Sequence, residues 1–107
     1  DAIIDKMNRL PDQYTTLAVR KKGKVIGLIQ WRRREKGVVW LSNIIVRPRY
    51  RRKGVGKFMI ANMTTFFDSD TIFRAYSWED GFYKALGWKR KRDLMELSPY
   101  GRKSKLE

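Results

Sequence analysis

Two residue types with special chemistry are missing from this chain of 107 residues, which contains neither cysteine nor histidine. The lack of cysteine excludes disulfides, thiolate metal sites and a cysteine nucleophile. The lack of histidine removes the most common general base and the most common metal ligand, so we expect no metal site. Any acid–base chemistry must therefore use carboxylates, tyrosines, a terminal amine or water.

Long apolar runs and acidic residues are also scarce. No apolar stretch reaches the roughly 18 residues that a membrane span needs, and no signal-peptide pattern opens the chain, so we expect a cytoplasmic protein without membrane contact. Asp and Glu number 11 against 25 Lys and Arg, which leaves a net charge of +14 at pH 7. A field of that sign attracts nucleic acid or an anionic cofactor, although it also serves solubility alone.

What the chain does contain is enough apolar material for one core. Hydrophobic residues make up 42% of it, with four Trp and five each of Tyr and Phe, which is too much for a disordered chain. The length suits a single domain over residues 1–107. Residues 99–107 form a basic tail that we expect to be mobile, and its final Leu106-Glu107 matches a dipeptide that expression vectors often leave ahead of a tag.

Hydrophobic spacing and turn residues predict an α/β domain with a mixed sheet. The expected helices are 2–10, 77–86 and one that runs to about residue 67, and the expected strands are 15–20, 24–34, 38–47, 71–76 and 93–98. Lys21-Lys22-Gly23 is typical of a tight hairpin, and Ser77 to Asp80 has the form of a capping box. The order predicts three antiparallel strands in a meander, followed by a βαβ unit with parallel strands.

The most informative stretch runs from Ile44 to Lys57, where an apolar strand stops at Pro48 and a basic turn opens a helix. The run Val38 to Val46 is apolar on nearly every residue, as in a strand buried on both faces. Gly54 and Gly56 remove side chains where backbone N–H groups would approach a ligand, and the free N–H groups of a helix start favour an anion. We therefore predict a phosphate cradle, surrounded by Arg51, Arg52, Lys53 and Lys57.

Spacing excludes two better-known phosphate loops. A Walker A loop would need glycine at Arg51 and Ser or Thr at Phe58, and a dinucleotide fingerprint starting at Gly54 would need a small residue at Met59. The pattern Arg51-x-x-Gly54-x-Gly56 instead resembles the coenzyme A signature of the GNAT superfamily of acyl-CoA N-acyltransferases.

A second motif and the order of elements extend this resemblance over most of the chain. Phe82-Tyr83-Lys84-Ala85-Leu86-Gly87-Trp88 resembles the Phe-Tyr-x-x-Leu-Gly-aromatic segment on the last conserved helix of the family. The expected strands and helices are similar to the GNAT core, so a GNAT-like fold is implied. The family's usual first strand and first helix have little room before Ala2, so we expect an N-terminally short version.

The resemblance implies an acetyl-CoA-dependent N-acetyltransferase in which an amine attacks the thioester directly. It implies that backbone amides of residues 52–57 hold the coenzyme pyrophosphate and that main-chain groups of residues 44–46 pair with the pantetheine arm. The implied coenzyme-binding residues are Ile44, Ile45, Val46, Arg51, Arg52, Lys53, Gly54, Val55, Gly56 and Lys57. Tyr83 stands where relatives protonate the departing thiolate, a transfer that a phenol with a pKa near 10 would nearly balance. The plainer role of Tyr83 is a core aromatic.

The sequence also departs from the family pattern. Many relatives carry a glutamate base on the strand before the cradle, but Trp40 to Ile44 contains no carboxylate, so the base is unassigned. Ser42 or Asn43 could hold a relay water or satisfy a local hydrogen bond. The asparagine that many relatives have before the last helix is absent from Tyr76 to Phe82, and capping is the expected role of Glu79 and Asp80.

Excess charge supports an alternative function, a nucleic-acid-binding or nucleic-acid-modifying GNAT-like protein directed at tRNA or DNA. Two basic groups outside the cradle would contribute to it, unless they are solvated strand ends: Arg32, Arg33 and Arg34, and Lys89, Arg90, Lys91 and Arg92. Stacking faces could come from Trp31, Trp40, Trp78 and Trp88, although aromatics in so small a domain are mostly core. The acceptor stays open between a small amine, a protein amine and nucleic acid.

Overall fold

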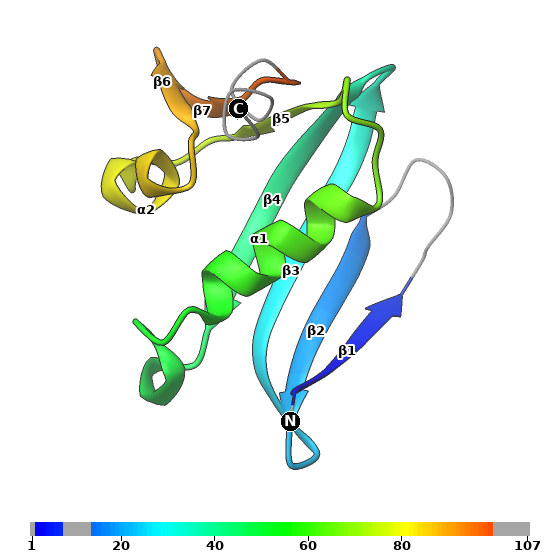
Figure 1. Ribbon diagram of the computed structural model, residues 1–107, viewed down its shortest axis with the longest axis vertical. Helices are drawn as coiled ribbons and strands as arrows, with labels where there is room; N and C mark the ends of the chain where they lie inside the picture. The colour runs from blue at the N-terminus through cyan, green and yellow to red at the C-terminus, as the bar shows by residue number, and fades with distance from the viewer. Residues whose placement is uncertain (1, 8–13, 100–107) are drawn as a thin grey trace.

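The computed structural model describes residues 2–7 and 14–99, and most of the expected basic tail lies outside the described residues. Within these ranges, seven strands form one sheet in the order β1-β2-β3-β4-β5-β7-β6 (Figure 1). The strands are β1 Ala2–Met7, β2 Thr15–Lys21, β3 Lys24–Glu35, β4 Val38–Val46, β5 Ile72–Ala75, β6 Lys89–Lys91 and β7 Leu94–Leu97. The helices are α1 Val55–Thr65, α2 Asp80–Ala85 and the short 3-10 helix η1 Pro48–Tyr50. Neither α-helix of the described ranges is long and apolar enough to cross a membrane.

The expected mixed α/β fold is confirmed. Strands β1 to β4 are antiparallel neighbours, and β4 continues through α1 into β5, which pairs with β4 in parallel and completes a βαβ unit. The hairpin between β2 and β3 turns at Lys22 and Gly23. Their φ values of 51° and 80° lie in the left-handed region that two-residue hairpins favour.

The helix expected over residues 2–10 is wrong, because Ala2–Met7 forms the edge strand β1. This strand pairs with β2 in an antiparallel register from Ala2↔Lys21 to Met7↔Thr16. A short apolar-rich segment fits either periodicity, and pairing with the free edge of β2 satisfies backbone groups of both strands. The meander therefore has four antiparallel strands instead of three.

Near the C-terminal end, the expected capping box at Ser77 is wrong and one strand was not expected. Helix α2 has Glu79 as its N-cap, and the Ser77 hydroxyl accepts a hydrogen bond from the Glu79 N–H at 3.1 Å, so Ser77 does not cap the helix. The charge run after Trp88 contains the short strand β6, which pairs with β7. Gly87, which follows the C-cap residue Leu86 of α2, has a φ of 93°, as is common just past the end of a helix.

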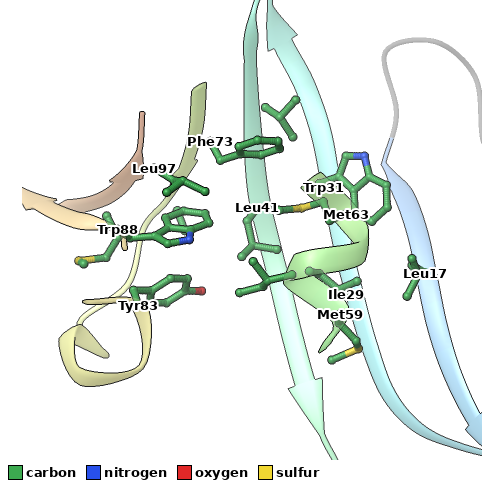
Figure 2. Close-up of a cluster of buried hydrophobic side chains, with 14 of the residues drawn as sticks. Leu17, Ile29, Trp31, Leu41, Met59, Met63, Phe73, Tyr83, Trp88 and Leu97 are labelled. Carbon is green, nitrogen blue, oxygen red and sulfur yellow. The ribbon is translucent and has the colours of Figure 1, made fainter. Parts of the chain in front are cut away.

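Helix α1 lies across one face of the sheet, and the main core fills the space between them (Figures 1 and 2). Met59 and Met63 of α1 are fully buried there. They share the core with sheet residues Leu17, Val19, Ile29, Trp31, Val39 and Leu41. Gly27 of β3, which the sequence analysis did not single out, sets the spacing, since a Cβ there would lie 2.9 Å from Cγ1 of Val55. A larger residue there would require the Val55 or Met59 side chain to shift.

Candidate functional site

The site begins where β4 and β5 separate. The two strands pair only over Val38–Leu41 of β4, which then runs on to Val46 beside β3 alone among the described strands. The expectation that this whole run is buried on both faces is therefore wrong beyond Leu41, and Ile45 is 58% exposed. The second half of β4 presents an open edge.

Backbone groups of Ile44 and Val46 face this open edge. Successive residues of an antiparallel strand direct their N–H and C=O groups to alternate sides. The Arg47 N–H donates to a carbonyl of β3 at 2.9 Å, so the backbones of Val46 and Ile44 point the other way. In agreement, the Val46 carbonyl accepts a hydrogen bond from Nε of Arg51 at 3.0 Å. By the same alternation, Ile45 directs its backbone toward β3.

A cleft of about 970 Å³ opens between this strand edge, the start of α1 and α2. It is lined by residues 41–46, 50–52, 54–57 and 75–77, together with Glu79, Phe82, Tyr83, Ala85 and Leu86. Every residue predicted to bind coenzyme or to protonate the thiolate therefore lines one cavity, except Lys53. The sequence places these residues in two distant motifs, and the fold brings them together.

The first turn of α1 is suited to an anion. The helix begins after Gly54, and its first hydrogen bond runs from the Phe58 N–H to the Gly54 carbonyl at 2.9 Å. The N–H groups of residues 55–57 precede that ladder and have no partner within it. No acidic residue occupies this turn, and cationic side chains line the same cleft. Free N–H groups and positive charge together favour a phosphate.

Glycine is required at positions 54 and 56 of the cradle for two different structural reasons. Gly54 has φ 84° and open space around it, so the backbone conformation selects glycine there. A Cβ at Gly56 would lie 3.1 Å from Cζ of Phe82 and 3.7 Å from Cδ1 of Ile44. The missing side chain of Gly56 thus makes room for packing between α1 and α2, a contact that the sequence interpretation did not anticipate.

Tyr83 lies between the cleft and the core around Trp88. Its side chain is 3% exposed, its ring centroid is 5.0 Å from that of Trp88, and its hydroxyl points toward β4 (Figure 2). Burial and, to a smaller extent, the negative charge of Glu79 raise the pKa of Tyr83 to about 12, against an opposing hydrogen bond with Ser77. The phenol therefore stays protonated at neutral pH, and it is a weaker acid than the pKa near 10 expected from the sequence.

Glu79 is a cleft residue to which the sequence analysis assigned only a capping role. Its side chain makes no capping hydrogen bond, and it is the only Asp or Glu among the described residues that line the cleft. Its neighbour Asp80 is engaged elsewhere, in ion pairs with Arg90 and with Lys84 at 3.4 Å. The sequence could have indicated that Glu79 lies near Tyr83, because Glu79 precedes Tyr83 by four residues, which is about one helical turn.

Of the two relay candidates on β4, the Asn43 amide is already held by the neighbouring strand. Its Nδ2 donates to Oε1 of Gln30 at 3.0 Å, and Gln30 in turn donates to Thr16 at 3.0 Å. The local hydrogen bond was one of the two roles left open for Asn43. Ser42 is exposed and lines the cleft.

The sequence profile of the acetyltransferase (GNAT) family matches residues 2–88. The chain belongs to this family. No curated protein sequence matches it.

Solved GNAT structures share this fold. The PaiA N-acetyltransferase from Thermoplasma acidophilum, in complex with coenzyme A, is 18% identical with a TM-score of 0.70, and the match covers 79% of this chain and 60% of that one. A protein from Exiguobacterium sp. 255-15, described as an acetyltransferase, is 13% identical with a TM-score of 0.80 and coverage of 100% and 99%. YhhK from E. coli, described as an N-acetyltransferase and bound to coenzyme A, is 18% identical with a TM-score of 0.71 and coverage of 84% and 75%. The chain thus spans about 60% of the length of the PaiA protein.

The arginines at the end of β3 in this GNAT chain do not form one surface. Arg33 lies over the Phe67 ring near the end of α1, with 5.3 Å from its Cζ to the centroid. Strand alternation places Arg32 and Arg34 on the opposite face. There, Arg32 lies over Tyr14 at 5.5 Å, and Arg34 lies over a buried Trp ring of β4 at 5.2 Å.

In the second basic group, residues 89–92, two side chains are already engaged in contacts within the protein. Arg90 pairs with Asp80, donates to the Ser77 carbonyl at 2.5 Å and lies 4.6 Å from the ring centroid of the exposed Trp78. Lys91 places Nζ 2.6 Å from the buried carboxylate of Glu96. Lys89, Lys91 and Arg92 of this run are exposed, but Lys91 is held by its ion pair. The other tryptophans, Trp31, Trp40 and Trp88, are buried.

Proposed function

We propose that this protein is an acetyl-CoA-dependent N-acetyltransferase that transfers the acyl group to an amine by direct attack in a ternary complex. The observation that carries the proposal is the single cleft that unites the open edge of β4, the first turn of α1 and Tyr83. Membership of the acetyltransferase family supports it, as does the coenzyme A bound in the PaiA and YhhK structures.

The cleft fits such a donor in size and charge. Its volume is near the upper end of the range of about 300–1,000 Å³ that is usual for small-molecule sites. Residues 55–57 offer N–H groups for the pyrophosphate, with Arg51 and Arg52 beside them. Ile44 and Val46 offer strand-edge groups to an amide-bearing arm. Acetyl-CoA supplies an acyl group activated as a thioester.

Three groups of the chain each carry out one part of the acyl transfer. The Ile44 N–H, on the open edge of β4, is placed to polarise the acyl carbonyl. Glu79 takes up, directly or through water, the proton that the attacking amine loses as the C–N bond forms. The hydroxyl of Tyr83, which is protonated at neutral pH, gives its proton to the thiolate released when the C–S bond breaks, although its raised pKa makes this transfer less favourable than it would be from an ordinary phenol.

Calorimetric titration of acetyl-CoA tests the donor site. We expect the wild type to bind and Gly54→Glu to lose binding, because a carboxylate would enter the phosphate cradle. Gly37→Glu is the matched control, since Gly37 also has a positive φ of 78° and open space but lies in the turn between β3 and β4. The proposal fails if the wild type does not bind at high micromolar coenzyme, or if Gly54→Glu binds as the wild type does.

A coenzyme-release assay tests the acceptor class. Small amines, peptides with free N-termini and charged tRNA are compared at fixed acetyl-CoA. Release of the thiol with any amine, dependent on Tyr83, supports N-acetylation. Release that proceeds equally without an amine would show only hydrolysis and would contradict it.

A further inference from the structure

A second cavity, of about 380 Å³, opens on the side of the sheet away from α1. Its characteristic side chains are Tyr14, Arg32, Arg34, Trp40 and Tyr76. Leu41 of β4 belongs to the core under α1, and strand alternation places its neighbour Trp40 on the opposite face. The second cavity therefore approaches the strand junction from the side opposite the α1 core.

The two cavities meet at the point where β4 and β5 separate. Leu41, Ser42 and Tyr76 line both of them. A molecule in the second cavity can thus present one end to the cleft that contains Tyr83. This arrangement would allow two substrates, one entering from each side, to meet with their reacting atoms close together.

The second cavity is positively charged and contains no carboxylate among its described lining residues. Arg32 and Arg34 form no ion pair within the part of the chain that the structure describes, and Nε of Arg32 is buried there without a hydrogen-bond partner. The nearby Arg74 is different, because it pairs with Glu96 at 2.8 Å and with Glu35 at 3.6 Å. Two guanidinium groups are therefore available for an external anion.

Aromatic rings supply the apolar wall of the second cavity. Trp40 and Tyr76 are stacked, with centroids 4.8 Å apart and an interplanar angle of 24°. Tyr76 is 63% exposed and Tyr14 39% exposed, so both rings can be covered by a ligand. Such rings bind the flat or apolar part of a small molecule.

We propose that the second cavity is the acceptor pocket and that it takes a small amine that also carries a carboxylate or phosphate. This rests on the proposed N-acetyltransferase function. Arg32 and Arg34 bind the anionic group, because the planar guanidinium of arginine can donate two parallel hydrogen bonds to a carboxylate or phosphate. The amine at the other end of the molecule is directed past Ser42 into the cleft. Polyamines without an anion are disfavoured by the like charge of the two arginines. The size of the cavity suits a small molecule.

Matched substrate pairs that differ only in the anion test this proposal. Tyrosine is compared with tyramine and phosphoethanolamine with ethanolamine, with spermidine as the polyamine, in the coenzyme-release assay. We expect the anionic member of at least one pair to have a kcat/KM about 10- to 100-fold higher, the range of a hydrogen bond to a charged group. The preferred pair also tells whether carboxylate or phosphate is the natural anion. Equal values, or a preference for the amines without an anion, would overturn the proposal.

Variants connect the preference to the second cavity. Arg32→Gln and Arg34→Gln should each raise the KM of the anionic acceptor by about tenfold or more and leave acetyl-CoA binding unchanged. Arg33→Gln, on the opposite face beside Phe67, is the matched control and should behave as the wild type. A preference that survives both variants would overturn the proposal.

The results of these experiments distinguish failure of the acceptor pocket from failure of the proposed N-acetyltransferase function. Failure to bind acetyl-CoA would defeat the N-acetyltransferase itself. If acetyl-CoA binds but no small amine is turned over, binding of the same pairs is measured by calorimetry with coenzyme A present. Lack of binding by every anionic member, or turnover of charged tRNA or peptides alone, would overturn the anionic small-amine pocket and leave the donor site intact.

Discussion

Gly56 of α1 and Phe82 of α2 are in direct packing contact: a Cβ on Gly56 would lie 3.1 Å from Cζ of Phe82. The contact joins the two sequence motifs that carry the family resemblance. It sets the distance between the phosphate-binding turn and the helix that holds Tyr83. The motifs are therefore one structural unit and not two independent signals.

We predict that Gly56→Ala lowers stability and weakens coenzyme binding. The added methyl must displace Phe82 by a few tenths of an ångström or separate α1 from α2. Overpacking of this kind typically costs about 1–3 kcal/mol, which we expect to exceed the roughly 0.5–1 kcal/mol that alanine gains over glycine inside a helix. Gly81→Ala is the matched control, because nothing lies within 4 Å of a Cβ at Gly81 and alanine favours the helix by roughly 0.5–1 kcal/mol. Urea unfolding and calorimetry of both variants measure the difference.

The same contact can be tested by rescue. Phe82→Leu shortens the side chain that opposes Gly56, so the double variant should bind coenzyme better than Gly56→Ala alone. Strictly additive effects of the two substitutions would show that the residues do not interact and would contradict the packing account.

Replacing Tyr83 by phenylalanine should lower kcat by about 100-fold or more and leave the Kd of acetyl-CoA nearly unchanged, because the hydroxyl acts on the proton and not on coenzyme binding. Since the pKa of Tyr83 is raised to about 12, kcat/KM of the wild type should not decline between pH 8 and about pH 11. A declining limb centred near pH 10 that disappears in Tyr83→Phe would contradict the raised pKa.

Ionisation of Tyr83 also predicts a loss of stability at high pH. The folded-state pKa of about 12 lies above the usual value of 10.0, so the folded protein holds the phenolic proton more tightly than the unfolded chain. This contribution is fully present below pH 10 and is lost as pH rises toward 12. Chemical unfolding from about pH 8 to pH 11 should show a steeper decline in the wild type than in Tyr83→Phe. If the free energy of unfolding declines equally with pH in the wild type and in Tyr83→Phe, the predicted contribution of Tyr83 is wrong.

Glu79→Gln should lower kcat by about 100-fold at neutral pH if Glu79 takes the amine proton, and it should lower the pKa of Tyr83 by removing a nearby negative charge. Asp80→Asn is the control, because Asp80 is held by Arg90 and should affect stability more than kcat. Steady-state kinetics and ultraviolet titration of the phenol measure the two effects. An unchanged kcat in Glu79→Gln would show that Glu79 is not the general base.

Glu96→Gln should destabilise the fold at neutral pH by about 1–3 kcal/mol, since Glu96 is 6% exposed and bonds Arg74 at 2.8 Å and Lys91 at 2.6 Å. Burial opposes its ionisation, but these hydrogen bonds outweigh burial and hold the pKa of Glu96 below the usual value of 4.5. Its contribution is present above that value and is lost as pH falls through the lowered pKa. Urea unfolding at neutral pH and at about pH 3 should show the wild type approaching the variant in acid.

Much of this site could be predicted from short-range sequence patterns. Pro48 ends a strand and Gly54 permits a positive φ for local reasons, and the basic residues beside them mark an anion site. The capping box at Ser77 failed because backbone and side-chain hydrogen bonds of the turn compete at this range. The helix expected at residues 2–10 failed because a neighbouring strand edge decided between two periodicities that the segment fits equally well.

The sequence by itself determined the composition limits, the order of most elements and the two motifs, because strand alternation, helical spacing and turn conformation depend on residues close together in the chain. Only the tertiary structure decided that β4 parts from β5 beyond Leu41, that Glu79 lines the cleft with Tyr83, and that Arg32 and Arg34 face a cavity while Arg33 does not. These features depend on packing between segments far apart in the sequence, which burial and backbone pairing select together. The raised pKa of Tyr83 follows from that burial, so no pattern along the chain could have given it.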